Sequence, residues 1–505
     1  MGYCGNCGKI VGSLCLFLVI GKATANGPIE LHGSGTTNPS KFYWQMIDLF
    51  EERSKTPLHM SYRAVGSSTG QAEFLGDGTA ALNDFGSGDI PMKSSNFQNL
   101  TTNSREMVHF AFAMGAIGIF HSVPDSATGG ELDLTPCLLA RIFAGDITTW
   151  DHPDIIQRNQ NLNVPTNTPI MMVHRVEGSS STSGFTQYLD TECSASWSLG
   201  YGSTVARGNR GVGRQGSDGV SGYIKETPYA IGYIDSGHGH NLGLSEISLR
   251  NRNGNYLTTL QANIASAGDL ATSVFPSSSD QDFSNVNFLN LAGADTWPIT
   301  MMTYIYLQKD MSSMDAHKSG LLYAMLEFIL SDEGQQLLVD KAFTSIPTAV
   351  KEYNRISMNT TIVWPANRTQ FIFETASKTQ KWVGQGEYVI SAKRSTYANY
   401  ERANFDQDIT TLKTSVTSLQ TDVASVNTQV SALNSGCSCD DDDDSKNIAG
   451  AAIAFSLISM VVSVVSLFFA MRKSNQRRGM DNCVPSVSKP SHVELDDKTT
   501  PTHDV

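Results

Sequence analysis

Hydroxyl and charged side chains gather in residues 175–181, which read Arg-Val-Glu-Gly-Ser-Ser-Ser. The apolar run 169–173 before them indicates a strand, and the pattern after them indicates a helix. The first N–H groups of a helix carry partial positive charge, and serines at its start add O–H donors, so this turn is suited to an anion. Arg175 adds a forked positive charge that matches a phosphate-like oxyanion. Because a serine before a helix is more often only a cap, this turn alone leaves both interpretations open.

The same pattern occurs twice more near the start of the chain. Residues 33–39 and 65–70 are rich in glycine and hydroxyl side chains, and each follows an apolar run and precedes a helical pattern. Thr37 and Asn38 are expected to cap the first of these helices. In open α/β sheets, ligands collect at the carboxyl ends of the strands, where such turns lie. The turns together predict one anion site.

Asp89 follows a glycine-spaced strand pattern and places a carboxylate in the same region. A carboxylate repels a fully ionised anion, but it fits an anion that carries a proton. Near neutral pH phosphate is protonated and sulfate is not, so sulfate would leave a buried Asp89 without its donor, at a cost of several kcal/mol. The alternative is that Asp89 is only a cap or turn residue.

These blocks resemble the phosphate-binding proteins of phosphate ABC transporters, the periplasmic receptors of the PstS type. The likeness extends from about Leu31 to about Ile362. It implies an α/β, two-lobed periplasmic-binding-protein fold of type II, with a hinge and an interlobe cleft that holds phosphate. The segments that carry the likeness are Gly33–Thr37, Gly66–Ser68, Phe85–Asp89, Arg175–Ser179, Gly202–Val205, Ala230–Tyr233 and Trp297–Thr300.

The resemblance also implies the site residues. Glu177 would pair with the arginine, although it replaces an aspartate of the family, and Asn38 stands where an aromatic residue is common. Whether Ser181 or Thr182 supplies the last hydroxyl stays open. The phosphate-binding residues would be Thr37, Asn38 through its backbone, Ser67, Arg175, Ser179, Ser180 and Ser181, with Asp89 accepting the proton of the ligand.

Short apolar runs alternate with helical patterns through residues 26–362, as in an α/β protein. By resemblance, one lobe is expected at about 29–107 and 300–350, and the other at about 108–299. The chain would cross between the lobes near Val108 and near Ile299. The expected strands include 29–32, 60–65, 115–120 and 170–173, and the expected helices include 138–143 and 320–330.

Residues 1–25 have the form of a secretory signal peptide, with an apolar stretch too short to span a bilayer and a small-residue end. In a secreted protein Cys137 and Cys193 are candidates for a disulfide, but the sequence leaves their proximity open. Asn99, Asn359 and Asn367 begin glycosylation sequons.

The C-terminal part indicates a membrane-anchored stalk. No role is assigned to 363–405, and apolar residues then alternate at spacings of three and four through 406–434. This seam predicts a coiled coil between copies of the chain, the alternative being a helix packed on its own body. A linker rich in Cys and Asp at 435–446 precedes an apolar transmembrane segment at 447–471. The basic residues after it place the tail, 472–505, in the cytoplasm.

Several function classes are disfavoured. The net charge is −13 without a basic stripe, so nucleic-acid binding is not expected. Thr182 replaces the last glycine of a Gly-x-Ser-x-Gly elbow, so the chain is not expected to be an enzyme. His238 and His240 lack a third metal ligand at usable spacing, and neither a metal nor a cofactor is expected.

The sequence therefore predicts a single-pass, oligomeric cell-surface protein, with its binding domain outside, that binds inorganic phosphate. It would deliver phosphate to a membrane transporter for uptake. The alternative is a surface adhesion, structural or phosphate-sensing protein with the same fold.

Overall fold

The computed structural model of the protein describes residues 27–436 except 79, 206–209, 270, 378 and 380–382. The chain divides into two compact units between Thr396 and Tyr397. The first unit is an α/β body, and the described part of the second is a single long helix, α15 (Tyr397–Gly436). Two hydrophobic cores define a first and a second lobe within the body.

The first lobe is built from both ends of the body. Its elements are β1 (Ile29–Gly35), α1 (Ser40–Arg53), β2 (Leu58–Ala64), α2 (Ser67–Leu75), β3 (Phe85–Gly88), α3 (Ser94–Thr102), α10 (Ala265–Gly268), α11 (Ala271–Val274), β11 (Thr300–Gln308), α12 (Ala316–Leu330), α13 (Asp332–Val339), α14 (Thr348–Ile356), η1 (Ser357–Thr361), β12 (Ile372–Glu374), η2 (Val383–Gln385) and β13 (Val389–Ser391).

The second lobe is built from the middle of the chain and shares β4 (Met107–His121) with the first. Its other elements are α4 (Asp125–Thr128), β5 (Leu132–Leu134), α5 (Pro136–Ala144), α6 (Pro153–Arg158), β6 (Met171–Arg175), α7 (Ser180–Glu192), β7 (Val212–Arg214), α8 (Gly216–Glu226), β8 (Ala230–Asp235), α9 (Ser236–Asn241), β9 (Ser245–Arg250) and β10 (Tyr256–Leu257).

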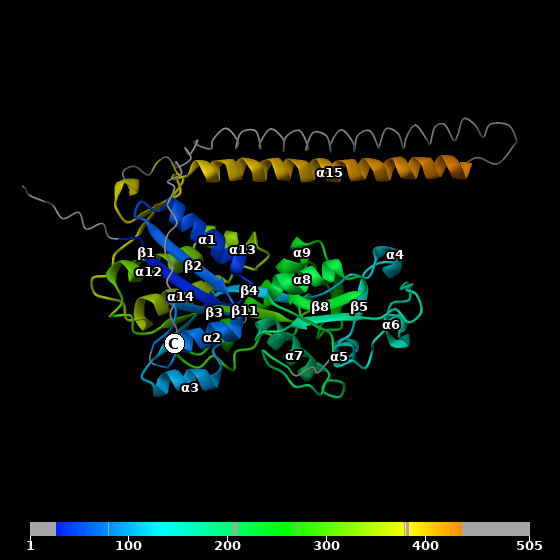
Figure 1. Ribbon diagram of the computed structural model, residues 1–505, viewed down its shortest axis with the longest axis horizontal. Coiled ribbons are helices and arrows are strands. Elements are labelled where there is room, and N and C mark those ends of the chain that lie inside the picture. The colour runs from blue at the N-terminus through cyan, green and yellow to red at the C-terminus, as the bar shows by residue number, and fades with distance from the viewer. Residues whose placement is uncertain are drawn as a thin grey trace, which may run out of the picture. The chain divides into compact units, whose positions relative to one another are not determined.

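One sheet runs through both lobes in the strand order β2-β1-β3-β11-β4-β8-β6-β7. Figure 1 labels its strands from β2 to β8. β1 pairs in parallel with β2 and β3, and β8, β6 and β7 pair in parallel in the second lobe. The antiparallel strands β11 and β4 lie between these two parallel halves. The carboxyl ends of β1, β2 and β6 lead directly to the three turns that the sequence predicts to bind an anion, and the end of β3 leads to Asp89.

The passage between the lobes lies within β4. Val108 to Met114 belong to the first core, whereas Ala116 and Ile117 belong to the second. The crossing is thus at Gly115 rather than near Val108, because the ladder with β11 begins at Met107 and carries the strand through the first lobe. The return, between Met301 and Met302 in β11, lies close to the expected crossing near Ile299.

A second difference concerns a segment that we expected in the second lobe. Ala267, Phe275, Phe283 and Phe288 pack in the first core instead. The aromatic rings of Phe275 and Phe283 lie 5.3 Å apart, and His109 of β4 stacks on Phe283 at 4.4 Å. The aromatic residues of this segment therefore complete the first core, an arrangement that strand and helix patterns do not reveal.

The extension 363–405, to which the sequence gives no role, belongs largely to the body. Its strands β12 and β13 pair in parallel, and Ile390 is part of the first core. The ring of Phe373 lies 6.1 Å from that of Phe50 in α1. The extension thus covers an outer face of the first lobe.

The segment 406–434 is helical, as its seam predicts, and forms most of α15. Apolar residues of that seam stay partly exposed, with Val416 at 42% and Leu419 at 40%. Among the helices of the described residues, none is both long and apolar enough to cross a bilayer. The predicted signal peptide 1–25, transmembrane segment 447–471 and tail 472–505, and nearly all of the linker 435–446, lie outside the described residues.

Candidate anion-binding site

Asp89 is the centre of the first-lobe half of the site. It follows β3 and is only 3% exposed. Its Oδ2 accepts hydrogen bonds from Thr36 Oγ1 at 2.5 Å, Asn38 Nδ2 at 2.8 Å and Ser180 Oγ at 2.7 Å. Its Oδ1 accepts one from Thr303 Oγ1 at 2.8 Å. Hydroxyl and amide groups from three separate segments therefore surround this carboxylate.

Burial raises the pKa of Asp89 above its ordinary value, and the hydrogen bonds from Thr36, Ser180 and Thr303 oppose that shift only in part. All four donors are neutral, so they hold the carboxylate in place without cancelling its charge. Asp89 is consequently well suited to accept a proton from a bound ligand.

Arg175 is the centre of the second-lobe half of the site. It ends β6, and its side chain is 1% exposed. Glu177 Oε1 accepts a hydrogen bond from Arg175 Nε at 2.5 Å and a second, shorter one from Arg175 Nη2. Arg175 also donates to Thr37 Oγ1 at 3.2 Å and to Ser217 Oγ at 3.5 Å. Because Glu177 also accepts from the backbone N–H of Gly216 at 3.0 Å, it fixes the direction in which Arg175 points.

The serine turn at the start of α7 completes this half. Ser179 is the helix cap, its Oγ accepting from the backbone N–H of Thr182 at 3.5 Å. Ser180 donates to Asp89, and Ser181 accepts from Asn38 Nδ2 at 3.4 Å. Thr182 instead bonds to Tyr233 at 2.8 Å. Of the two candidates for the last hydroxyl, Ser181 therefore faces the other predicted site residues.

Ser67 begins α2 and is fully buried. Its hydroxyl has no hydrogen-bond partner among the described residues. Gly66 before it has a φ of +90°, and a Cβ there would lie 2.9 Å from the carbonyl oxygen of Gly178. Glycine thus lets the start of α2 approach the second lobe closely. A buried hydroxyl without a partner is costly, and a ligand in the site would supply one.

The predicted binding residues lie close together, but within the described part of the chain the side chains of Ser67 and Ser179 make no hydrogen bond to the others. The structure also adds three hydroxyl residues that the sequence did not single out for binding: Thr36 and Thr303 on Asp89, and Ser217 on Arg175. A cavity of about 570 Å³ borders Asp89 and is lined by residues of both lobes, including Lys93 and Ser203. It provides space beside the acid.

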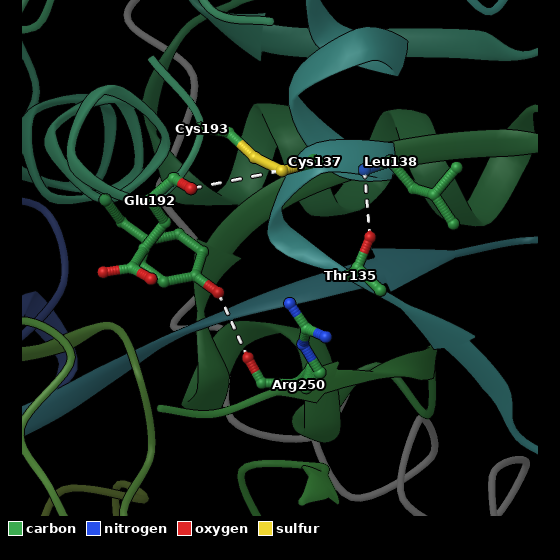
Figure 2. Close-up of a disulfide and its surroundings, with 7 residues drawn as sticks. Thr135, Cys137, Leu138, Glu192, Cys193 and Arg250 are labelled. Atoms are coloured by element: carbon green, nitrogen blue, oxygen red, sulfur yellow. Dashed lines mark hydrogen bonds between the residues drawn. A yellow bond between two sulfur atoms is a disulfide. The ribbon is translucent and has the colours of Figure 1, made fainter. Parts of the chain in front are cut away.

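Away from the site, Cys137 and Cys193 form the disulfide that the sequence left open (Figure 2). Their Cα atoms are 5.3 Å apart, and the bond joins the first turn of α5 to the residue after α7. It thereby fastens the far end of the helix that carries the serine turn. The predicted sequon residues Asn99, Asn359 and Asn367 are all exposed.

Comparison with known proteins agrees with this arrangement. Residues 22–333 match the PBP superfamily domain. The phosphate-binding protein PstS of Haemophilus influenzae is 30% identical over 323 residues, which cover 64% of this chain and 90% of that protein. The structure is similar to that of a human phosphate binding apolipoprotein, with a TM-score of 0.53 at 17% identity, covering 67% of this chain and 98% of that one. It is also similar to the high affinity periplasmic phosphate-binding protein PfluDING, with a TM-score of 0.51 at 19% identity, covering 67% of this chain and 96% of that one. The chain belongs to the PBP superfamily and, within it, to the PstS family of phosphate-binding proteins.

Proposed function

We propose that the protein binds inorganic phosphate in a cleft between its two lobes. The observation that carries this proposal is the pairing of a buried acid, Asp89, with a buried guanidinium, Arg175, around one set of hydroxyl groups. The guanidinium attracts the charge of the anion, and the acid accepts the hydrogen that phosphate retains at neutral pH. The family to which the chain belongs supports the same ligand.

The hydroxyl groups would change partners when phosphate binds. Thr36 and Ser180 donate to Asp89 in this structure. A hydroxyl hydrogen rotates at little cost, so each can turn toward a phosphate oxygen while the P–O–H group donates to Asp89. Sulfate offers no such hydrogen and would place its charge against the carboxylate. The site would therefore bind phosphate in preference to sulfate.

Calorimetric titration of the full-length protein with phosphate, and separately with sulfate, tests this proposal. We expect phosphate to bind much more tightly. Asp89→Asn should reduce the ratio of the two affinities by about 10- to 100-fold, because the ligand hydrogen loses its charged acceptor. The control is Asp154→Asn, which alters a carboxylate paired with Arg141 in the second lobe and should leave the ratio unchanged. Equal affinities of the wild-type protein for both anions would contradict the proposal.

We further propose that the protein holds this site at the cell surface, as a single-pass protein with a cytoplasmic tail, and passes phosphate to a membrane transporter. The apolar segment 447–471 and the basic residues after it support this placement. Cells that express the Arg175→Ala variant at wild-type surface levels should then take up less phosphate. Uptake equal to that of wild-type cells would argue against delivery.

We also propose that α15 joins copies of the chain. The partly exposed Val416 and Leu419 support this, since a helix with such a seam gains by burying it against a partner. Val416→Asp combined with Leu419→Asp should lower the oligomeric state of the detergent-solubilised protein in analytical ultracentrifugation. Thr417→Asp combined with Ser418→Asp, on the same turn of the helix, is the control and should leave it unchanged. If neither pair of changes alters the sedimentation coefficient, α15 does not join copies of the chain.

A further inference from the structure

The first turn of α8, like those of α2 and α7, lies among the hydroxyl groups of the predicted phosphate-binding residues. Ser217, the second residue of this helix, is 1% exposed. Its Oγ donates to Asn38 Oδ1 at 3.0 Å and lies 3.2 Å from Thr37 Oγ1 and 3.5 Å from Arg175. Each of these three neighbours occupies a predicted phosphate-binding position. Ser217 is therefore surrounded by the groups that would hold the ligand, although no motif in the sequence marks it.

Asp235, at the end of β8, lies behind Ser217. Its side chain is 6% exposed, and Oδ1 is bonded to His238, at 3.1 Å from the backbone N–H and 2.7 Å from Nδ1. Its Oδ2 is buried and has no hydrogen-bond partner among the described residues. Burial raises the pKa of Asp235, but His238 and, to a smaller extent, Ser217 outweigh burial and lower it below its ordinary value. The charge of Asp235 in turn adds a small contribution to the raised pKa of Asp89, which is due mainly to burial. A second buried carboxylate thus acts on the site from behind its hydroxyl groups.

His238 keeps this second carboxylate from repelling an anion. Its side chain is 4% exposed and touches Asp235 on one nitrogen and Asp218 on the other, at 3.4 Å. Burial alone would lower the pKa of His238, but the two carboxylates outweigh burial and raise it to about 9. Lys41 of the first lobe, 3.8 Å from Asp218, opposes that rise. At neutral pH the imidazole is accordingly protonated and balances the charge of Asp235.

We propose that Ser217 is a further phosphate-binding residue and that Asp235 and His238 are positioning residues for it. This inference rests on the proposed binding of phosphate. In the bound state the hydroxyl hydrogen of Ser217 turns from Asn38 to a phosphate oxygen. Arg175 continues to donate a hydrogen bond to Ser217 Oγ. The charge on His238 keeps the carboxylate of Asp235 from competing for the hydrogen of Ser217 and from repelling the ligand.

Calorimetry of the full-length protein with inorganic phosphate tests the role of Ser217. Ser217→Ala should weaken phosphate binding by about tenfold or more, the usual loss when one hydrogen bond to a charged group is removed. The matched control is Ser221→Ala. Ser221 is equally buried one turn later in α8, but its hydroxyl donates to the backbone carbonyl of Asp218.

The outcomes separate this inference from the proposed function. If wild-type protein binds phosphate and Ser217→Ala binds within twofold of it, the inference is wrong and the proposed function stands. An equal loss in Ser217→Ala and Ser221→Ala also overturns the inference, because the effect is then one of helix packing. If the wild-type protein does not bind phosphate at all, both fail.

The pH dependence of phosphate affinity tests the positioning role. The charged groups that face His238 are Asp235, Asp218 and Lys41. As His238 loses its proton around pH 9, Asp235 becomes unbalanced, and wild-type affinity should fall by about tenfold between roughly pH 8 and pH 10. His238→Gln, which keeps a donor for Asp235 but carries no charge, should bind more weakly at pH 7 and lose this fall. A decline of the same size in His238→Gln would overturn the role of the histidine.

Discussion

In the proposed mode of binding, the two lobes would recognise different properties of the same ligand. The first lobe contributes a carboxylate, Asp89, whose hydrogen-bond partners are neutral, and so it responds to a hydrogen on the ligand. The second lobe contributes Arg175, held by Glu177, and so it responds to negative charge. Neither half alone would distinguish phosphate from other anions. Selectivity would arise only when one ligand touches both halves.

Removing the guanidinium should have the largest effect. Arg175→Ala removes the charge that would attract the anion and leaves the partly buried Glu177 without its ion-pair partner, so we expect phosphate binding to weaken by about 2–5 kcal/mol, on the order of a thousandfold. Sulfate binding should weaken as much, because charge is common to both anions. Titration calorimetry with each anion measures this, and Arg175→Lys, which keeps the charge without the fork, should retain part of the affinity. If the loss is confined to phosphate, the assignment of charge recognition to the second lobe is wrong.

The lobes also differ in how they are held together, since the disulfide Cys137–Cys193 fastens only the second. Replacing both cysteines with serine should lower the free energy of unfolding by about 2–4 kcal/mol. Hydrogen exchange should show faster opening in α5 and α7, and unchanged protection in α12 of the first lobe. Equal loss of protection in both lobes would mean that they unfold as one unit.

The smallest predicted effect concerns the cost of burying Asp89. The folded protein raises the pKa of Asp89, so protonation of this group favours the folded state. This contribution to the free energy of unfolding is fully present below the pKa that Asp89 has in the unfolded chain. It is lost as the pH rises through the higher pKa of the folded protein. Asp89→Asn should therefore raise Tm at pH 7 by about 1–3 °C. The gain should vanish when the pH is brought below about 3.8, as calorimetric scans at both pH values can measure. An unchanged or lowered Tm at pH 7 would show that the hydrogen bonds compensate fully for the buried charge.

Much of the fold follows from local patterns in the sequence. The expected strand 29–32 is part of β1, and the expected helix 320–330 is the last part of α12. The serine turn lies at the start of α7, with Ser179 as its cap. These elements could be predicted because their apolar spacing and their caps are properties of adjacent residues.

The features that were missed depend on contacts between distant residues. Thr303 lies within an apolar strand and resembles any buried threonine until the register with β3 brings it to Asp89. Ser217 follows a polar turn with no motif around it. The sequence also does not predict the full length of β4. Only 115–120 is expected to be a strand, whereas the structure buries nearly every residue of β4 and so gives it no alternation of buried and exposed side chains. Strand pairing decides the outcome for Thr303 and β4, and the packing of α8 against β6 and β8 decides it for Ser217. Local sequence specifies neither.

The irregularity in the ladder between β11 and β4 links movement of the lobes to the acid of the site, Asp89. The register shifts between Thr303 and Tyr304, close to where the chain passes from one lobe to the other, so separating the lobes should twist the sheet there. Thr303 is the donor on Asp89 Oδ1, and its hydrogen bond lowers the pKa of that acid. A twist that withdraws Thr303 would remove one of the hydrogen bonds that oppose the effect of burial on this pKa. Movement of the lobes would in this way be coupled to how strongly Asp89 holds the hydrogen of the ligand.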